Sequence, residues 1–206
     1  MTANNTEASR RTPTQKRSKE RYELVVNTAK QLIGERGNDS VSMREIAKQA
    51  NIPISSIYQY FPDKNAILEA IMQSYFEEIR QGLRHFVDCC QCREDLKKGI
   101  IQGIDLFYAT FKQEPTLAIL WAGLQANPKL KELDAQDSRE NAGLLTDKLC
   151  CFSKNSSSNE IYNAVLLLLH SAGMTVRLAL DMEPAQADRF IDEYKALALL
   201  RLDALP

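Results

Sequence analysis

The chain has 206 residues, with 26 Lys and Arg against 27 Asp and Glu, a net charge of −1 and 44% hydrophobic residues. A chain of this length forms one or two domains and buries enough surface to fold without disulfides or a structural metal. Its 8 Gly and 7 Pro exclude a collagen-like protein, and its apolar content excludes global disorder.

The N-terminal segment and the apolar runs predict where the protein resides. No stretch approaches about 18 consecutive apolar residues, so no transmembrane helix is expected. The N-terminus, MTANNTEASRRTPTQKR, is polar and lacks the apolar segment of a signal peptide. We therefore expect a cytoplasmic protein with no membrane partner.

The five cysteines are odd in number and fall in two clusters, Cys89, Cys90 and Cys92, then Cys150 and Cys151. Without a signal peptide, reduced thiols are expected. The first cluster resembles part of a zinc site, but no second ligand group with zinc spacing accompanies it. We predict ordinary structural cysteines with no metal and no cofactor. Thiol-based sensing stays open as an alternative.

The near-zero net charge hides an asymmetry along the chain. Residues 1–64 hold 11 basic against 7 acidic residues, and residues 65–206 hold 15 against 20. The basic excess is concentrated between Arg10 and Arg21. Residues 1–15 lack periodicity and are predicted to form a flexible basic arm. Such an arm before a small helical unit indicates a polyanionic partner, although a merely solvated tail has the same composition.

Nearly all of the remaining chain has the apolar spacing of helices rather than the alternation of strands. The first predicted helix, residues 18–36, carries one apolar stripe and is followed by Gly37 and Asn38, which tolerate the left-handed conformation that ends helices. The stripe consists of Tyr22, Val25, Val26, Ala29, Leu32 and Ile33.

Two short helices follow and describe a helix-turn-helix. Ser42 and Glu45 have the spacing of a capping box, which predicts a helix over residues 43–49. A second helix is predicted over residues 53–60, because proline is tolerated at a helix start. Asn51 lies in the short turn between them, where a positive φ is expected.

The second half of the chain reads as a larger helical bundle. A fourth helix begins at about Lys64, and its length indicates that it continues into the second domain. Further helices are predicted at about residues 93–113, 115–125, 128–152, 159–181 and 184–205. The prediction is an all-α chain of about nine helices. Its parts are the arm (1–15), a helix-turn-helix domain (16–64, motif about 41–60) and a helical bundle (65–206).

The segment that spans residues 42–64 reads SMREIAKQANIPISSIYQYFPDK. It resembles the DNA-binding domain of the TetR family of transcriptional regulators, a likeness that extends over about residues 18–75. The remainder matches that family only in layout. The resemblance implies a repressor that binds a palindromic double-stranded DNA operator as a homodimer. The two C-terminal helices, at about residues 159–181 and 184–205, are too apolar for a free surface, so we expect them to form the dimer interface. The resemblance also implies release from DNA by a small effector bound in the C-terminal domain.

The side-chain chemistry of this segment favours DNA binding independently of the family resemblance. Short hydroxyl side chains reach base edges, longer polar arms reach phosphate oxygens, an isoleucine packs on a thymine methyl group, and arginine binds guanine or phosphate. The family pattern implies the same roles. The candidate DNA-binding residues are Ser42, Arg44, Ile54, Ser55, Ser56, Tyr58, Tyr60 and Lys64.

The C-terminal part carries aromatic and apolar residues near its expected middle, and ligand sites in bundles lie between helices. An ordinary core explains most of them equally well. We predict a largely apolar pocket for a small hydrophobic effector, with His170 or Arg177 as polar anchors. The candidate residues are Phe107, Tyr108, Phe111, Trp121, Leu124, Leu149, His170, Met174 and Arg177.

Enzymatic signals are weak. The chain has two histidines, and its sequence contains no nucleophile elbow, phosphate-binding loop or zinc-protease motif. We therefore predict no catalytic residues. Two alternatives from other classes are an α-helical enzyme and a thiol-sensing or ligand-binding helical protein whose helix-turn-helix does not bind DNA.

Overall fold

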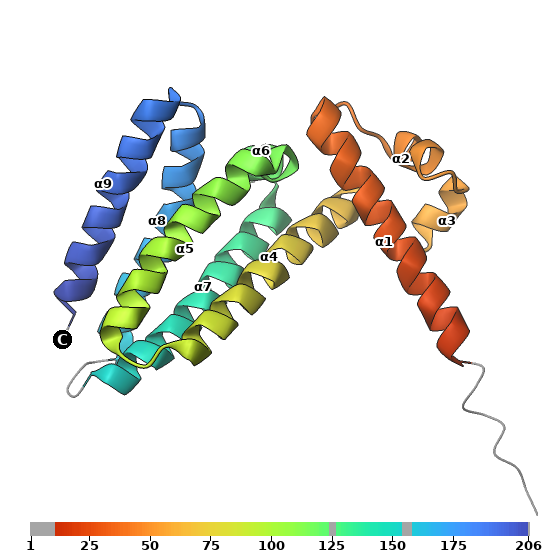
Figure 1. Cartoon of the computed structure of the whole chain (residues 1–206). Helices are drawn as coiled ribbons and strands as arrows, with labels where there is room; N and C mark the ends of the chain where they lie inside the picture. Colours follow the sequence, from red (N-terminus) through yellow and green to blue (C-terminus); the bar gives the residue numbers. More distant parts are fainter. Residues whose placement is uncertain (1–10, 124–126, 154–157, 206) are drawn as a thin grey trace, which may run out of the picture. The chain divides into compact units, whose positions relative to one another are not determined.

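A computed structural model describes residues 11–123, 127–153 and 158–205 of the chain. Over these residues it contains nine α-helices and no strand (Figure 1). The prediction of an all-α chain with an N-terminal helix-turn-helix and a larger helical part is therefore confirmed.

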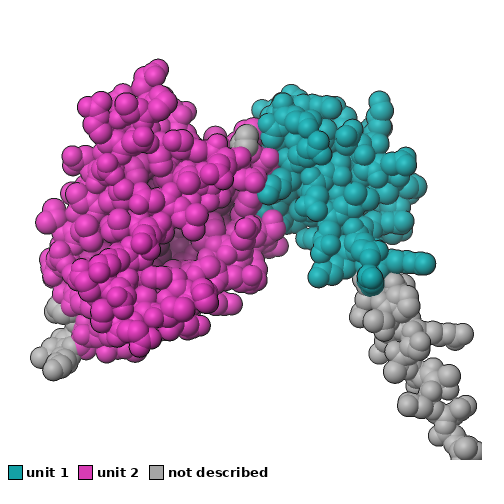
Figure 2. All heavy atoms as spheres, viewed as in Figure 1, with its two compact units in different colours: residues 1–71 teal, residues 72–206 magenta. Residues whose placement is uncertain are grey.

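The chain divides into two compact units, residues 1–71 and 72–206, called here the N-terminal and C-terminal units (Figure 2). The predicted division at residue 64 follows the end of the sequence motif. The structural division falls later because Ile67, Leu68 and Ile71, in the first turns of helix α4, are buried. Helix α4 (Lys64–Cys89) thus begins in the N-terminal unit and continues into the C-terminal one.

The N-terminal unit consists of α1 (Arg11–Arg36), α2 (Met43–Gln49), α3 (Ile54–Tyr58) and the start of α4. Helix α1 begins earlier than predicted, inside the segment assigned to the flexible arm. Pro13 does not prevent this, because the first four N–H groups of a helix have no intrahelical partner. The rest of the predicted arm, residues 1–10, lies outside the described residues.

The predicted signals around α2 are present. Ser42 accepts from the Glu45 amide at 3.3 Å, and the Glu45 carboxylate accepts from the Ser42 amide at 2.8 Å, which completes the capping box. Gly37 follows α1 with φ 80°, and Asn51 has φ 53° in the turn between α2 and α3. Both predictions of left-handed backbone are confirmed, so one left-handed residue follows each of α1 and α2.

The C-terminal unit contains the rest of α4 and five further helices, whose starts agree with the predicted ones. They are α5 (Arg93–Gln113), α6 (Pro115–Ala122), α7 (Pro128–Phe152), α8 (Ser158–Leu180) and α9 (Pro184–Asp203). Helix α8 packs between α7 and α9, and α5 packs against α8 and α9. Asn127 caps α7 by accepting from the amides of Lys129 and Leu130.

Helix α8 differs from the other described helices in one respect. By length and composition alone it is apolar enough to cross a bilayer, and only 28% of its apolar window is buried inside the fold. The expectation that no helix would have this character is therefore not met. Because α8 packs against α7 and α9, its inward side belongs to the core and its outward side is an apolar surface.

The turn at Asn51 yields a stability prediction. We expect Asn51→Ala to destabilise the protein by about 1–2 kcal/mol, because a Cβ-bearing residue other than Asn or Asp is strained at this φ. Asn51→Gly should leave stability almost unchanged. Urea unfolding of the full chain, followed by circular dichroism, compares the two variants. Equal stability of the alanine and glycine variants would contradict the argument.

Candidate functional site

The exposed surface of the helix-turn-helix contains polar side chains that do not contribute to its core. Arg44 on α2 and Ser55 on α3 are exposed, and Tyr58 is 52% exposed at the end of α3. Ile54 and Ser56 are half-buried, whereas Ile57, which follows Ser56, is fully buried. The surface also carries exposed basic residues on α1 and α2: Lys16, Arg17, Lys19, Arg21 and Lys48.

Two other predicted DNA contacts, Ser42 and Tyr60, also hold the fold together. The Ser42 hydroxyl donates to the Glu45 carboxylate at 2.8 Å in addition to its capping bond. These bonds from Ser42 lower the pKa of Glu45. The Tyr60 hydroxyl accepts from Ser18 at 3.2 Å, which ties the end of α3 to α1. These residues are therefore positioned by packing before any ligand binds.

Aromatic rings around Tyr60 strengthen that tie. The Tyr22 ring lies 4.8 Å from the Phe61 ring and 6.5 Å from the Tyr60 ring, measured between centroids. Phe61 is buried, and burial raises the pKa of Tyr22. The sequence placed Tyr22 in the apolar stripe of α1 but gave no sign that it supports Tyr60.

Lys64 occupies a structural position as well. Its ammonium donates to the carbonyls of Asn38 at 2.6 Å and Val41 at 3.0 Å, so it fastens the loop between α1 and α2. An ammonium has three N–H donors, so one remains for a phosphate. The α4 N-terminus is less open than expected, because the Asp63 carboxylate already accepts from the Ala66 amide.

The C-terminal unit contains a cavity of about 80 Å³. Five of the nine predicted effector-binding residues line it: Phe107, Trp121, His170, Met174 and Arg177. Seven further lining residues were not predicted: Phe76, Ile79, Asp134, Asp137, Ser138, Leu169 and Gly173. His170 and Met174 are also exposed, so the outer wall of the cavity reaches the surface of α8.

The other predicted effector residues lie elsewhere. Phe111 is buried behind the cavity, with its ring 5.2 Å from Trp121 and 4.9 Å from Phe107. Tyr108 is buried beneath the Lys112 ammonium. Leu149 belongs to a separate core cluster with Cys90 and Leu96, because its face of α7 points toward that cluster. Leu124 lies outside the described residues.

Two aspartates make the cavity more polar than the aromatic pattern predicts. Asp134 accepts a hydrogen bond from the Trp121 side chain, and burial raises its pKa, while the charges of His170 and Arg177 lower it. Burial also raises the pKa of Asp137, which the ion pair with Arg80 partly offsets. In the sequence, two carboxylates on one helix look like part of a solvent-exposed face. The packing of α7 in the structure shows that they line the cavity instead.

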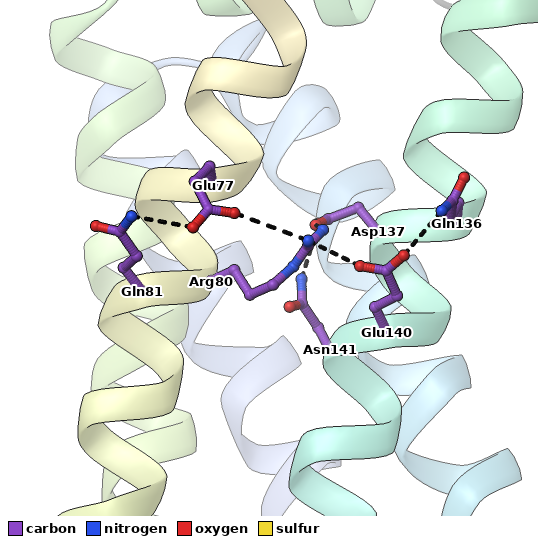
Figure 3. A network of polar contacts seen from close by, with 7 residues as sticks. All are labelled: Glu77, Arg80, Gln81, Gln136, Asp137, Glu140 and Asn141. Carbon is purple, nitrogen blue, oxygen red and sulfur yellow. Dashed lines mark hydrogen bonds and ion pairs between the residues drawn. The ribbon is translucent and has the colours of Figure 1, made fainter. Parts of the chain in front are cut away.

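Asp137 is the centre of a polar network between α4 and α7 (Figure 3). Arg80 donates to Asp137 at 2.6 Å and lies 2.8 Å from Glu140 and 3.9 Å from Glu77. The Asn141 amide donates to the second oxygen of Asp137 at 2.7 Å. With 18% of the Arg80 and 11% of the Asp137 side chain exposed, the pair is largely shielded from water.

The cysteines form no recognisable metal site. Cys89 and Cys92 are exposed, Cys90 is buried between them in sequence, and the Cys89 sulfur lies 4.0 Å from the His85 Nε2 atom. Cys151 donates to the Asp147 carbonyl at 3.2 Å. In the described part of the chain, no group of three His, Cys, Asp or Glu residues has a metal-binding arrangement.

Two family profiles match the chain, one in each unit. The profile described as bacterial regulatory proteins of the tetR family covers residues 25–71, and the profile described as a tetracyclin repressor-like C-terminal domain covers residues 94–205. The second match alone extends over more than half of the chain. Its range includes α5 to α9 and therefore most of the cavity wall.

Individual relatives agree with these profiles. The uncharacterised regulator YuxN of Bacillus subtilis is 37% identical over 60 residues, which are 29% of this chain and 21% of that protein. The regulator EthR of Mycolicibacterium smegmatis is 27% identical over 133 residues, 62% of this chain and 60% of EthR. A TetR-family regulator from Streptomyces coelicolor has the same fold, with a TM-score of 0.72 and 20% identity. The match covers 90% of this chain and 97% of that one.

Half-buried Asp134 leads to a pH-dependent prediction. Its pKa is raised in the folded state, so its charge opposes folding at neutral pH, and this cost disappears below the unfolded pKa of about 3.9. Asp134→Asn keeps an acceptor for Trp121 and should raise the melting temperature at pH 7 but not at about pH 3, which is below the unfolded pKa.

Asp147→Asn on the exposed side of α7 is the matched control, with little change expected at either pH. Thermal unfolding of the full chain at both pH values measures the effect. A lower melting temperature for Asp134→Asn at pH 7 would show that its charge stabilises the fold.

Proposed function

Because the chain belongs to the TetR family of transcriptional regulators, we propose that it is a repressor released from its operator by a small molecule. The observation that carries this proposal is the helix-turn-helix with Arg44, Ser55 and Tyr58 exposed beyond a fully buried core. The protein acts on double-stranded DNA and therefore functions in the cytoplasm. Members of this family are transcription regulators rather than enzymes.

The charge and shape of the N-terminal unit support DNA binding. An exposed arginine on α2 and a hydroxyl-bearing α3 offer groups for base edges, and the exposed basic residues of α1 offer groups for phosphates. The pairing of Tyr60 and Lys64 with neighbouring elements supports the same role, because a contact that is already fixed costs less ordering on binding.

The outward sides of α8 and α9 support a homodimer. Five large apolar side chains there are between 51% and 69% exposed: Leu167, Met174, Leu178, Leu197 and Leu200. We call these residues the α8–α9 face. Residues 167, 174 and 178 lie on one side of a helix. An exposed cluster of this kind is typical of a protein interface, and a symmetric pair of helices from each copy would cover it.

Dimerisation also explains how one short α3 helix reads an operator. Two copies would present two recognition helices to successive major grooves of a palindromic site, about 34–36 Å apart. The cavity in the C-terminal unit supports a small-molecule effector, with an apolar body between its aromatic walls.

The DNA proposal predicts distinct effects for two variants. Against DNA from upstream of its own gene, Arg44→Ala should lose about 1–3 kcal/mol of binding free energy and relax one operator position. Tyr58→Phe should weaken specific and random DNA similarly, because a phosphate contact carries no sequence information. Fluorescence anisotropy measures both, and log affinity should fall with log salt by about 0.9 per neutralised phosphate.

Arg84→Ala is the control for Arg44→Ala, since Arg84 is an exposed arginine in the C-terminal unit. It should leave affinity for DNA nearly unchanged. If the wild-type protein binds its upstream region no better than random DNA at moderate salt, the proposed function fails.

The dimer proposal predicts that charge on the α8–α9 face prevents assembly. Leu197→Glu with Leu200→Glu should convert a dimer to a monomer, because an unpaired charge buried in an apolar interface costs several kcal/mol. Leu106→Glu is the matched control, since Leu106 on α5 is 70% exposed and lies outside this face. Light scattering at micromolar concentration distinguishes the states, and a monomeric wild type would refute the proposal.

A further inference from the structure

A second hollow lies beside the effector cavity. It is a groove of about 340 Å³ along α4 and α7, bordered by Gln73, Glu77, Arg80, Leu133, Gln136 and Glu140. Phe76 and Asp137 line both the groove and the cavity. These two side chains therefore separate the cavity from the groove. The cavity alone is smaller than most ligand sites, whereas the two together reach the usual size.

The charges around these two hollows favour a positive ligand. Their lining contains four carboxylates, on Glu77, Asp134, Asp137 and Glu140, against two guanidinium groups, on Arg80 and Arg177, and the imidazole of His170. Burial raises the pKa of both Asp134 and Asp137, so a further negative charge beside them would be unfavourable. Three aromatic rings, of Phe76, Phe107 and Trp121, offer faces that attract cations.

Arg80 occupies the position beside Asp137 that a cationic ligand would take. Its guanidinium binds Asp137, but its buried Nε has no acceptor among the described residues. Asn141 is 6% exposed and donates to Asp137, while its Oδ1 atom is buried without a donor in the same part of the chain. Figure 3 shows Asn141 next to the Arg80–Asp137 pair. Asn141 borders neither hollow itself but is bonded to Asp137, which lines both, so a ligand N–H placed at Asp137 would satisfy an acceptor that Arg80 leaves unused.

We propose that the effector is an organic cation whose guanidinium, amidinium or ammonium group replaces Arg80 on Asp137 and donates to Asn141. Its apolar body lies between Phe76, Phe107 and Trp121. This proposal rests on the proposed function of the cavity as the effector site and names the ligand class. Asp137 is the specificity-determining residue, because a neutral or anionic ligand that displaced Arg80 would leave it buried and unpaired.

The exchange also connects binding to helix α4. Arg80 is on α4 and Asp137 on α7, so a ligand that binds Asp137 removes the ion pair between these helices. The hydrogen bond from Tyr75 on α4 to Glu114, at 3.1 Å, is outside the lining of both hollows and stays in place. The first turns of α4 belong to the N-terminal unit, so a ligand that moves α4 acts on a helix that is continuous with the helix-turn-helix.

The test uses three probes with the same eight-carbon chain: n-octylguanidinium, n-octanoate and n-octanol. Calorimetry with the full-length protein should show binding of the guanidinium and much weaker binding of the other two. Octanol measures the contribution of the apolar body alone, and octanoate reverses the charge. Equal or tighter binding of octanoate or octanol would overturn the proposal, as would no binding of the guanidinium.

Three variants locate the site. Asp137→Asn should weaken octylguanidinium binding by about 30-fold or more, as expected when one partner of a buried charge pair is removed. Arg80→Gln should tighten binding, because it removes the internal competitor for Asp137. Glu132→Gln is the matched control: it removes the same charge from an exposed position on α7 that borders neither hollow.

The opposite signs of the first two variants separate ligand binding from loss of folding, since a structural role alone would weaken binding in both. Circular dichroism confirms that each variant is folded. Arg80→Gln binding the probe more weakly than the wild type would overturn the proposal. DNA binding is measured separately, so failure of the cation site with intact operator binding leaves the proposed repressor function standing.

Discussion

The ion pair between Arg80 and Asp137 joins α4 to α7 in a largely shielded environment, and the effector site proposed here is built around it. A buried pair of this kind contributes little net stability compared with apolar packing, yet breaking it by removing one partner is costly. That combination suits a regulated contact better than a purely structural one. The orphaned Nε of Arg80 and Oδ1 of Asn141 indicate that the network is not fully satisfied by the protein itself.

The N-terminal unit follows a different principle, since three of its candidate DNA-binding residues also shape the helix-turn-helix. Ser42 caps α2, Lys64 holds the α1–α2 loop, and Tyr60 is anchored on α1. These bonds give a rigid support from which Arg44 and Tyr58 extend as exposed side chains. A surface organised in this way presents its base-reading groups with little conformational entropy to lose on binding.

Local signals in the sequence were sufficient for the helix-turn-helix. The capping box at Ser42 and the left-handed Asn51 depend on neighbouring residues, so both were predictable. The effector cavity was predictable only in part. Aromatic residues on α5 and α6 indicated where a pocket wall would be, but Asp134 and Asp137 look like solvated residues until α4 and α8 are packed on α7. Leu149 has the same helical spacing as a wall residue, and only tertiary packing assigns it to another cluster.

Met174 and His170 lie at the same time on the cavity wall and on the exposed side of α8. In the homodimer proposed here, the outer wall of each cavity is therefore continuous with the surface on which the partner packs. A ligand that moved Met174 in one protomer would change the surface on which the partner packs and, through it, the second site. Positive coupling of this kind would give a Hill coefficient up to about 2 for two sites and a response over a narrower range of effector concentration than that of a monomeric sensor.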